Sequence, residues 1–291
     1  MPKTVWQDKA VRLLLMSAAT TTILVVALIF VFVGKGAAPF VRSPGLPALA
    51  SDRWAPTSPE HPSFGLLPLL TGSLLVTGLA TLIVIPFGVC GAVYLSEVAR
   101  HAERELMKPF IELLAGIPSV VLGFFGLIVL APLVKSIFHL PSGLTALTGA
   151  LLLALMAVPT VISVSEDAIR AVPRSYKEAS LALGASKLQT IWRVTVPAAL
   201  SGIIAAVMLG MGRVIGETMA VMMVTGNAAL VTASPFESVR TMTATIAAEM
   251  GEVSFGSTHY SALFCVGIVL LLATFGLNMV AQRALRKYRM A

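Results

Sequence analysis

Long apolar runs alternate with short polar connections along this chain of 291 residues. Six predominantly apolar runs cover residues 13–33, 69–95, 111–134, 144–164, 197–225 and 260–281. At 1.5 Å per helical residue, each run is long enough to cross a hydrocarbon core of about 30 Å. In hydrocarbon the backbone polar groups need partners within the protein, and the runs lack the strict alternation of barrel strands. The pattern predicts an all-α integral membrane protein, with six transmembrane helices in a single domain over residues 1–291.

Composition agrees with this interpretation, since 57% of the residues are apolar, only 12% are charged, and the mean hydropathy is +0.89. A soluble domain carries about twice that charged fraction. Of the 21 Lys and Arg residues, fifteen fall at the two termini and in the loops after the second and fourth runs, and five fall on the opposite side. The positive-inside rule therefore places both termini in the cytoplasm. This topology explains the net charge of +7, and no nucleic-acid partner is predicted.

A secretory signal peptide is the alternative interpretation of residues 13–33, but this apolar run is longer than the about 7 to 15 residues typical of such peptides. Both cysteines, Cys90 and Cys265, fall in predicted spans, where a thiol acts as a small apolar side chain, and no disulfide is expected. The four histidines are isolated from one another, so no metal site is predicted.

The cytoplasmic loop over residues 172–197 has the pattern of two short amphipathic helices. Pro173 favours a helix start, Gly184 interrupts the pattern, and Ser186 is suited to cap a second helix. Such a pair can lie on anionic lipid, helped by Lys187 and Arg193, or it can dock against another protein, because a glycine at the corner permits close approach. Both interpretations stay open on the residues alone.

This loop also resembles the cytoplasmic motif of permease subunits of ABC-type importers. The family's spacing is E-A-A, three residues, G, nine residues, I, one residue, L-P. The corresponding residues here are Glu178, Ala179, Ser180, Gly184, Val194, Val196 and Pro197. The departures from the motif are Ala to Ser, Ile to Val and Leu to Val, with every spacing intact. The resemblance implies that the loop is the coupling helix, between transmembrane helices 4 and 5, that docks into the ATPase subunit.

Two further stretches, residues 111–133 and 212–228, resemble the third and fifth spans of the phosphate-specific permease C subunit. The resemblance implies a type I ABC importer fold and partners outside this chain. These partners are a second homologous permease subunit, two ATP-binding subunits and an extracytoplasmic phosphate-binding protein. The chain has no G-x-x-x-x-G-K-[ST] loop, so we expect a non-catalytic subunit that binds no cofactor and uses ATP hydrolysed by its partners.

Arg213 and Glu217 stand alone as charges in the apolar run 197–225. Each charge near the bilayer centre costs about 2.5 to 3.5 kcal/mol on insertion scales, so such residues usually face a protein or water interior. A continuous helix places Arg213 near mid-membrane and Glu217 one turn further on the same face. Either the two compensate each other within the helix, or they form the substrate pathway. In the second case Arg213 offers a planar fork of donors to hydrogen phosphate, and Glu217 is its counter-charge.

Other functions fit part of the pattern. A permease for another oxyanion, or an ion-gradient-driven secondary transporter, would also use an intramembrane Arg and Glu. An intramembrane enzyme would need a nucleophile and base or metal ligands at membrane depth, and none are clustered there. A regulatory or scaffold role is a further alternative. The external loops over residues 34–68, which is proline-rich and expected to be extended, and 226–259, which is acidic, are either solvated or touch an extracytoplasmic partner.

Overall fold

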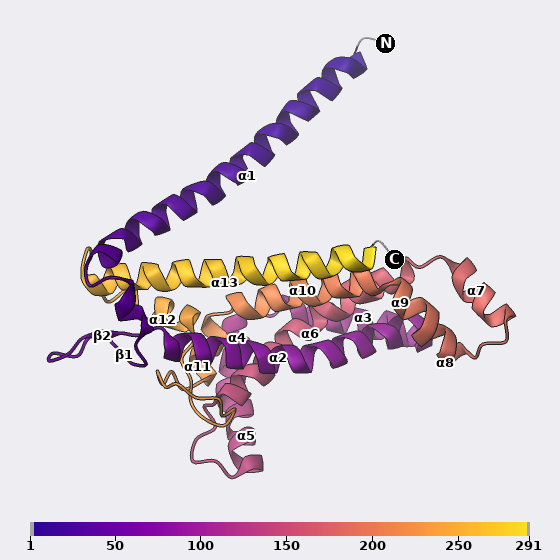
Figure 1. Ribbon diagram of the computed structural model, residues 1–291. Coiled ribbons are helices and arrows are strands. Elements are labelled where there is room, and N and C mark those ends of the chain that lie inside the picture. The colour runs from indigo at the N-terminus through magenta and orange to yellow at the C-terminus, as the bar shows by residue number, and fades with distance from the viewer. Residues whose placement is uncertain (1–2, 290–291) are drawn as a thin grey trace.

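The computed structural model describes residues 3–289, and most of this length is helical (Figure 1). The helices are α1 (Lys3–Arg42), α2 (Leu67–Val93), α3 (His101–Gly116), α4 (Ser119–Phe125), α5 (Ala131–Phe138), α6 (Ala146–Arg170), α7 (Arg174–Ala182), α8 (Lys187–Thr190), α9 (Val196–Ala198), α10 (Leu200–Gly216), α11 (Met219–Val224), α12 (Met242–Glu249) and α13 (Thr258–Arg289). Shorter elements between them are the 3₁₀ helix η1 (Leu46–Ala50), the π-helical segments η2 (Tyr94–Val98), η3 (Gly126–Leu130) and η4 (Ile191–Thr195), and the antiparallel strand pair β1 (Trp54–Ala55) and β2 (Ser63–Phe64).

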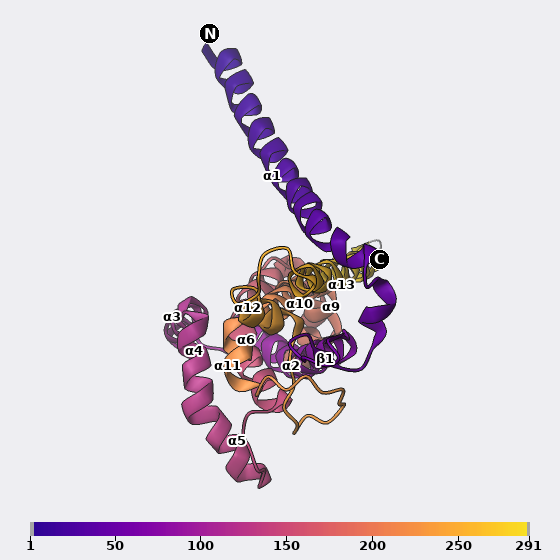
Figure 2. The same ribbon diagram turned by 90° about the vertical axis from the view of Figure 1, so that its left-hand side faces the viewer.

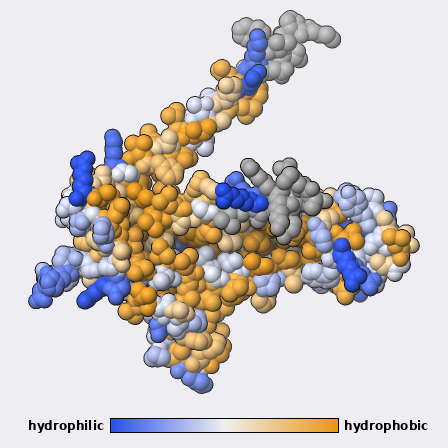
Figure 3. Space-filling model, viewed as in Figure 1, coloured by the Kyte–Doolittle hydropathy of each residue, from blue (hydrophilic) through white to orange (hydrophobic). Residues whose placement is uncertain are grey.

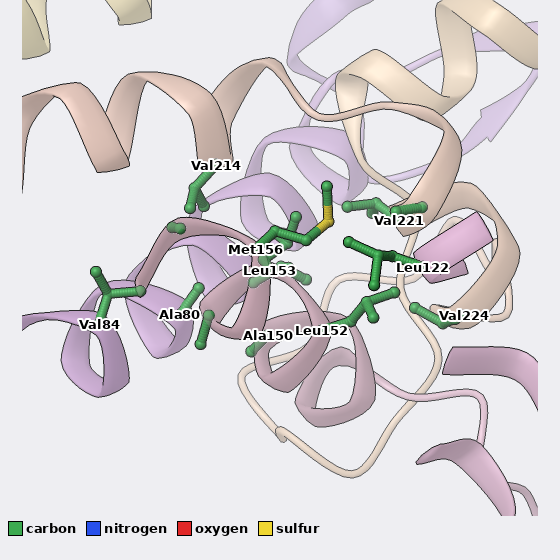
Figure 4. Close-up of a cluster of buried hydrophobic side chains, with 14 of the residues drawn as sticks. Ala80, Val84, Leu122, Ala150, Leu152, Leu153, Met156, Val214, Val221 and Val224 are labelled. Carbon is green, nitrogen blue, oxygen red and sulfur yellow. The ribbon is translucent and has the colours of Figure 1, made fainter. Parts of the chain in front are cut away.

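Helix α6 is the centre of a bundle in which it packs against α2 on one side and α10 on another. Its apolar side chains, among them Leu152, Leu153 and Met156, meet residues of α2, α4, α10 and α11 in the main core cluster (Figure 4). Glycines bring the helices close together. A Cβ atom added at Gly88 or at Gly210 would lie 2.6 or 2.5 Å from a methyl group of Val161, so only glycine fits at either position.

The molecular surface has the polarity expected in a membrane. Figure 3 shows an apolar band across the middle of the molecule, with hydrophilic residues gathered at the end that carries β1 and β2 and at the opposite end that carries α7 and α8. Within the described residues, five helical segments are long and apolar enough to cross a membrane, and a sixth is a bent pair. They are Lys9–Arg42, Leu67–Val98, Ser119–Phe138, Ala146–Arg170 and Thr258–Met279, with Lys187–Ala198 and Leu200–Gly216 as the pair.

The span predicted over residues 111–134 is divided between two helices in the structure. Helix α3 ends at Gly116, Ile117 and Pro118 are extended, and α4 begins at Ser119. A proline disfavours helical geometry in the residue before it and has no N–H to donate, which accounts for the break. In Figure 1 the segment from α4 to α5 then leads away from the direction of the bundle. Pro86 and Pro159, by contrast, lie within α2 and α6 without ending them.

A loop was predicted over residues 34–68, but in the structure helix α1 extends beyond residue 34. Helix α1 continues to Arg42 with Pro39 inside it, and its last turns pack against α13, where Phe40 and Ala37 are buried. Toward its N-terminus α1 diverges from the rest of the molecule in both ribbon views (Figures 1 and 2). The most apolar window of α1 contains no residue buried within the structure.

A carboxylate connects several segments at the end of the molecule that carries β1 and β2. Glu249 at the end of α12 accepts hydrogen bonds from Trp54 Nε1 at 3.1 and 3.2 Å, pairs with Arg240 Nη1 at 2.7 Å, and lies 2.8 Å from His259 Nε2. Four separate segments of sequence therefore meet at one side chain. The proline-rich segment thus forms an ordered layer of short elements, with η1, β1 and β2, and not the extended connection expected from its prolines.

Candidate functional site

The fifth predicted span, residues 197–225, is broken where its charges lie. Helix α10 ends at Gly216, Glu217 is extended with φ −71° and ψ 129°, and α11 begins at Met219. Gly216 is a poor helix former, and the N–H groups of Thr218 and Ala220 bond to the Glu217 side chain instead of to carbonyl groups of α10. The prediction that Arg213 and Glu217 lie one turn apart on the same face of a continuous helix is therefore wrong.

Arg213 lies in the last turn of α10 and is half-buried. Its Nη2 atom donates to the carbonyl oxygen of Ala115 at 3.4 Å, next to the last residue of α3. Carbonyl groups at the C-terminus of a helix carry a partial negative charge, so this contact favours the guanidinium there. No ion pair within 4.0 Å involves Arg213 in the part of the chain that the structure describes.

Glu217, unlike Arg213, is stabilised by the N-terminal end of a helix. Its Oε1 atom accepts hydrogen bonds from the backbone N–H groups of Thr218 at 3.2 Å and Ala220 at 3.3 Å, so the carboxylate caps the start of α11. Its backbone carbonyl accepts a hydrogen bond from Thr243 Oγ1 at 3.1 Å. Arg213 and Glu217 therefore do not compensate each other within one helix, which was the alternative to a role in the substrate pathway.

A small cavity of about 50 Å³ lies beside the break. Glu217 and the hydroxyl-bearing residues Ser73, Thr77, Thr241 and Thr243 contribute to its otherwise apolar lining. The valines that flank the break, Val214 and Val221, both belong to the core cluster around α6 (Figure 4). Apolar packing on both sides thus holds the break in place. The polar groups lie in the lining of the cavity beside it.

The loop over residues 172–197 forms the compact pair of helices expected from its pattern. Helix α7 follows Pro173, and Gly184 then adopts φ +85°, a left-handed conformation that glycine reaches without strain. Ser186 caps α8: its Oγ accepts from Gln189 N–H at 3.3 Å, and Gln189 Oε1 accepts from Ser186 N–H at 2.9 Å. The loop lies at the end of the molecule opposite the β-strands (Figure 1).

The residues of the predicted coupling motif lie largely on the surface. Glu178, Ala179, Gly184 and Pro197 are exposed, whereas the Oγ of Ser180 lies 3.0 Å from Thr190 Oγ1 and joins α7 to α8. Large apolar side chains are exposed beside them, with Leu183 reaching 90% exposure. The others are Tyr176, Leu181, Leu188 and Trp192. The structure thus places Glu178, Ala179, Ser180 and Gly184 in one knob formed by α7 and α8, whereas Pro197 lies beyond it in α9.

One charged cluster was not anticipated from the sequence. Glu166 near the end of α6 is only 1% exposed, and it pairs with Arg104 Nη2 at 2.7 Å and Lys108 Nζ at 2.9 Å, both from α3. Arg170 lies 3.5 Å away on its own helix. The sequence held one signal, a Glu four residues before an Arg at the end of an apolar run. The partners on α3 are about sixty residues distant, so no local pattern could have identified them.

The chain matches the sequence profile of a family described as "Binding-protein-dependent transport system inner membrane component" over residues 85–288. It is 40% identical to the "Probable ABC transporter permease protein YqgH" of Bacillus subtilis, over 91% of this chain and 86% of that protein. It is 35% identical to the "Phosphate transport system permease protein PstC" of Mesorhizobium japonicum, over 84% and 79%. It is 36% identical to "PstC 1" of Mycobacterium tuberculosis, over 77% and 73%.

Solved structures of similar fold include chains of two ABC transporters. A chain of a bacterial alginate ABC transporter superposes with a TM-score of 0.67 over 97% of both chains at 15% identity. A chain of the inward-facing methionine transporter MetNI superposes with a TM-score of 0.57, over 77% of this chain and 94% of that chain, at 19% identity. These similarities establish the all-α permease architecture and say nothing of the substrate.

Proposed function

Because this chain belongs to the family of binding-protein-dependent transport system inner membrane components, we propose that it is the permease subunit of an ATP-driven importer of inorganic phosphate. Two relatives support phosphate as the substrate, since both are named phosphate transport system permease protein and are 35% and 36% identical to this chain over most of its length. The observation that carries the proposal is the position of Arg213, a guanidinium at a helix break inside an apolar segment. A cation in that position is suited to an anionic substrate.

Arg213 is the proposed phosphate contact in the substrate pathway. Its Nη2 atom is engaged by the Ala115 carbonyl at a long 3.4 Å, which leaves the other donors of the guanidinium for a ligand. Arginine stays charged at any working pH, and its planar fork matches the geometry of an oxyanion. The contact with α3 holds the guanidinium in place without neutralising it.

Glu217 is the second proposed pathway residue, but it acts through its field and not as an ion-pair partner. Its carboxylate caps α11 while remaining close in sequence to Arg213. A negative charge near the arginine limits how tightly an anion is held, and a transporter must release its substrate. Glu217 therefore favours passage over retention.

The coupling loop is the proposed contact with ATP-hydrolysing subunits. Its support is the knob formed by α7 and α8, in which Glu178, Ala179, Ser180 and Gly184 lie beside exposed apolar side chains and Pro197 marks the return to the membrane. An apolar knob rimmed by polar residues is typical of a protein interface. The chain itself is non-catalytic and binds no cofactor, since energy enters through ATP used by two partner subunits.

A second homologous permease is the proposed partner in the membrane. Its support is the large apolar surface of α1 and the outer face of α3, where Leu106, Phe110 and Leu113 are exposed. An extracytoplasmic phosphate-binding protein is the proposed partner at the end that carries β1 and β2. Both termini lie in the cytoplasm in this arrangement, in keeping with the N-terminal end of α1 and the C-terminal end of α13, which point toward the α7 side in Figure 1.

Reconstitution tests the proposal directly. The chain is assembled in proteoliposomes with its candidate partner permease, ATPase and binding protein, and uptake of labelled phosphate is measured with and without ATP. We expect ATP-dependent phosphate uptake that excess unlabelled phosphate suppresses and sulfate does not. Uptake driven by an ion gradient without ATP, or competition by sulfate as strong as that by phosphate, would contradict the proposal.

A further inference from the structure

Helix α3 connects the coupling-loop end of the molecule with Arg213. It is 16 residues long, about 24 Å, and its last turn carries the Ala115 carbonyl that accepts from the guanidinium. None of its residues is buried. The half-buried residues of α3 recur at helical spacing, and they are Glu103, Arg104, Lys108, Ile111, Leu114 and Ala115. A helix without a buried apolar face is held mainly by its polar contacts.

The first polar contact of α3 is with Glu166. This carboxylate is almost completely buried and accepts from Arg104 Nε at 2.9 Å and from Lys108 Nζ at 2.9 Å. A buried carboxylate without partners is strongly unfavourable, so these two side chains attach the middle of α3 to the core helix α6. Among the described residues, neither end of α3 has a comparable ion pair with α6.

The second contact joins the start of α3 to the coupling loop. Lys177 of α7 forms an ion pair with Glu97 of η2, and both side chains are largely covered, with 24% and 11% exposure. Glu97 lies four residues before α3 begins. The junction is stiffened by Glu103, whose Oε2 accepts from Arg100 N–H at 3.0 Å and from the Tyr94 hydroxyl at 3.2 Å.

The coupling loop is therefore connected to both partners of the hydrogen bond between Arg213 and the Ala115 carbonyl. On one side, η4 and α9 continue into α10, which carries Arg213, through a bend of 69° at Ala199. On the other side, the Lys177–Glu97 pair attaches α7 to η2, which continues α2, and the Glu103 contacts join η2 to α3, which carries Ala115. Apolar side chains of the loop, among them Val172 and Ile191, also pack with Ala92 and Val93 at the end of α2. Movement of the loop would therefore displace α10 through the backbone, and η2 with the start of α3 through the ion pair and this packing.

We propose that Lys177 and Glu97 are positioning residues that transmit movement of the coupling loop to α3, so that the Ala115 carbonyl and Arg213 change position relative to each other during transport. Glu166 is the fixed point about which α3 moves. The proposal rests on the proposed function, since it takes the loop as the ATPase contact and Arg213 as the anion contact. It adds a second connection from the coupling loop to the contact between Ala115 and Arg213, beside the covalent connection through α10.

Charge reversal tests the pair. Lys177→Glu and Glu97→Lys are made singly and together in the full transporter, and phosphate uptake and ATP hydrolysis are measured in proteoliposomes at equal copurified ATPase. Each single variant is expected to hydrolyse ATP with uptake per ATP reduced about tenfold, within the range typical of coupling between sites. The double variant is expected to recover to within about threefold of the unmodified chain, because the opposite charges face each other again.

Controls separate this result from other failures. Glu105→Lys changes an α3 carboxylate that is 71% exposed and paired only at the surface, and it is expected to leave uptake per ATP unchanged. If the reversals do not assemble, Lys177→Met with Glu97→Gln removes the charges and keeps the side-chain volumes, and its uptake per ATP is expected to fall. Unchanged uptake per ATP in the assembled single variants or in this neutral pair, or a double reversal no better than the singles, would overturn the proposal. Failure of the proposed function itself would be seen earlier, as an unmodified transporter that takes up no phosphate.

Discussion

Arg213 and Glu217 are four residues apart, yet each is stabilised by a different helix end and not by the other. The guanidinium donates to a C-terminal carbonyl of α3, and the carboxylate accepts from N-terminal amides of α11. Partial charges at helix ends thus compensate two full charges inside an apolar segment. Separate compensation means that the proposed passage of an anion would not first have to break a strong ion pair between them.

Replacing Arg213 tests the anion contact. Arg213→Gln keeps a donor toward Ala115 but loses the charge, and we expect phosphate uptake to fall by about a hundredfold, since each hydrogen bond to a charged group contributes about 1.5 to 3 kcal/mol. Arg213→Lys is expected to be impaired as well, because a point charge cannot reproduce a bidentate contact. Uptake of labelled phosphate is measured at equal membrane abundance.

The matched control for this prediction is the double variant Arg213→Leu with Glu217→Leu. It removes both charges and their insertion penalties, so it is expected to insert into the membrane while carrying no phosphate. Normal uptake by this variant would show that the two charges serve packing alone.

Two substitutions separate the capping role of Glu217 from its charge. Glu217→Gln retains an oxygen acceptor for the amides of α11 and is expected to unfold near the temperature of the unmodified chain. Glu217→Leu loses the cap and about 1 kcal/mol of stability. Thermal unfolding in detergent measures the difference, and equal melting temperatures would mean that the cap contributes nothing. In uptake assays, a change caused by Glu217→Gln at unchanged stability is assigned to the charge.

Gly184 is required by its backbone conformation, since a Cβ atom there meets nothing within 4 Å but φ is +85°. Asparagine tolerates this left-handed region and valine does not. We expect Gly184→Asn to copurify with the ATPase subunit and Gly184→Val to lose most of this association while the chain still inserts in the membrane. Normal copurification and transport by Gly184→Val would show that the loop is not the ATPase contact. Loss of association by Gly184→Asn as well would indicate close approach of the partner at this corner.

The Glu166 cluster gives a stability prediction. Arg104→Leu with Lys108→Leu leaves a buried carboxylate without its two nearest cations and is expected to destabilise the chain by about 3 to 5 kcal/mol. Adding Glu166→Leu is expected to recover most of this loss, because no uncompensated charge remains. Chemical unfolding in detergent measures both variants, and a triple variant as unstable as the double would refute the ionic explanation.

The same cluster has a defined pH dependence. The hydrogen bond to Glu166 raises the pKa of Lys108 above its ordinary value, despite the opposing effect of partial burial. A raised pKa in the folded state means that the stabilisation is complete below the unfolded value of about 10.4 and disappears only as pH rises through the folded value. We therefore expect the difference in stability between the unmodified chain and Lys108→Met to be constant between about pH 6 and pH 9. A difference that falls within this window would contradict the assignment.

Glu249 is expected to stabilise the layer of short elements around β1 and β2. Glu249→Gln weakens the contacts with Arg240 and His259, so amide hydrogen exchange in residues 240–257 should become faster than in the unmodified chain. Glu252→Gln, an exposed carboxylate three residues further on, is the control and should leave the exchange unchanged. Equal exchange in the two variants would mean that Glu249 does not order this layer.

The sequence by itself determined the class of protein and the local fold of the loop over residues 172–197. Apolar runs of sufficient length admit only helices in hydrocarbon, and the loop over residues 172–197 folds by local rules, with Pro173, Gly184 and Ser186 each acting within a few residues of its own position. The two costly charges, Arg213 and Glu217, were identifiable for the same reason, since a charge in an apolar run is visible without any knowledge of its neighbours.

Only the tertiary structure decided what those charges contact and where the helices end. Hydropathy does not distinguish a continuous helix from one broken at Gly216 or at Pro118, because the residues on both sides of each break are equally apolar. The partner of Arg213 is 98 residues away, and the partners of Glu166 and Lys177 are 58 to 80 residues away. Contacts of this kind depend on which helices pack together, and that choice is made by the fit of small and large side chains around α6, which leaves no periodic signal in the sequence.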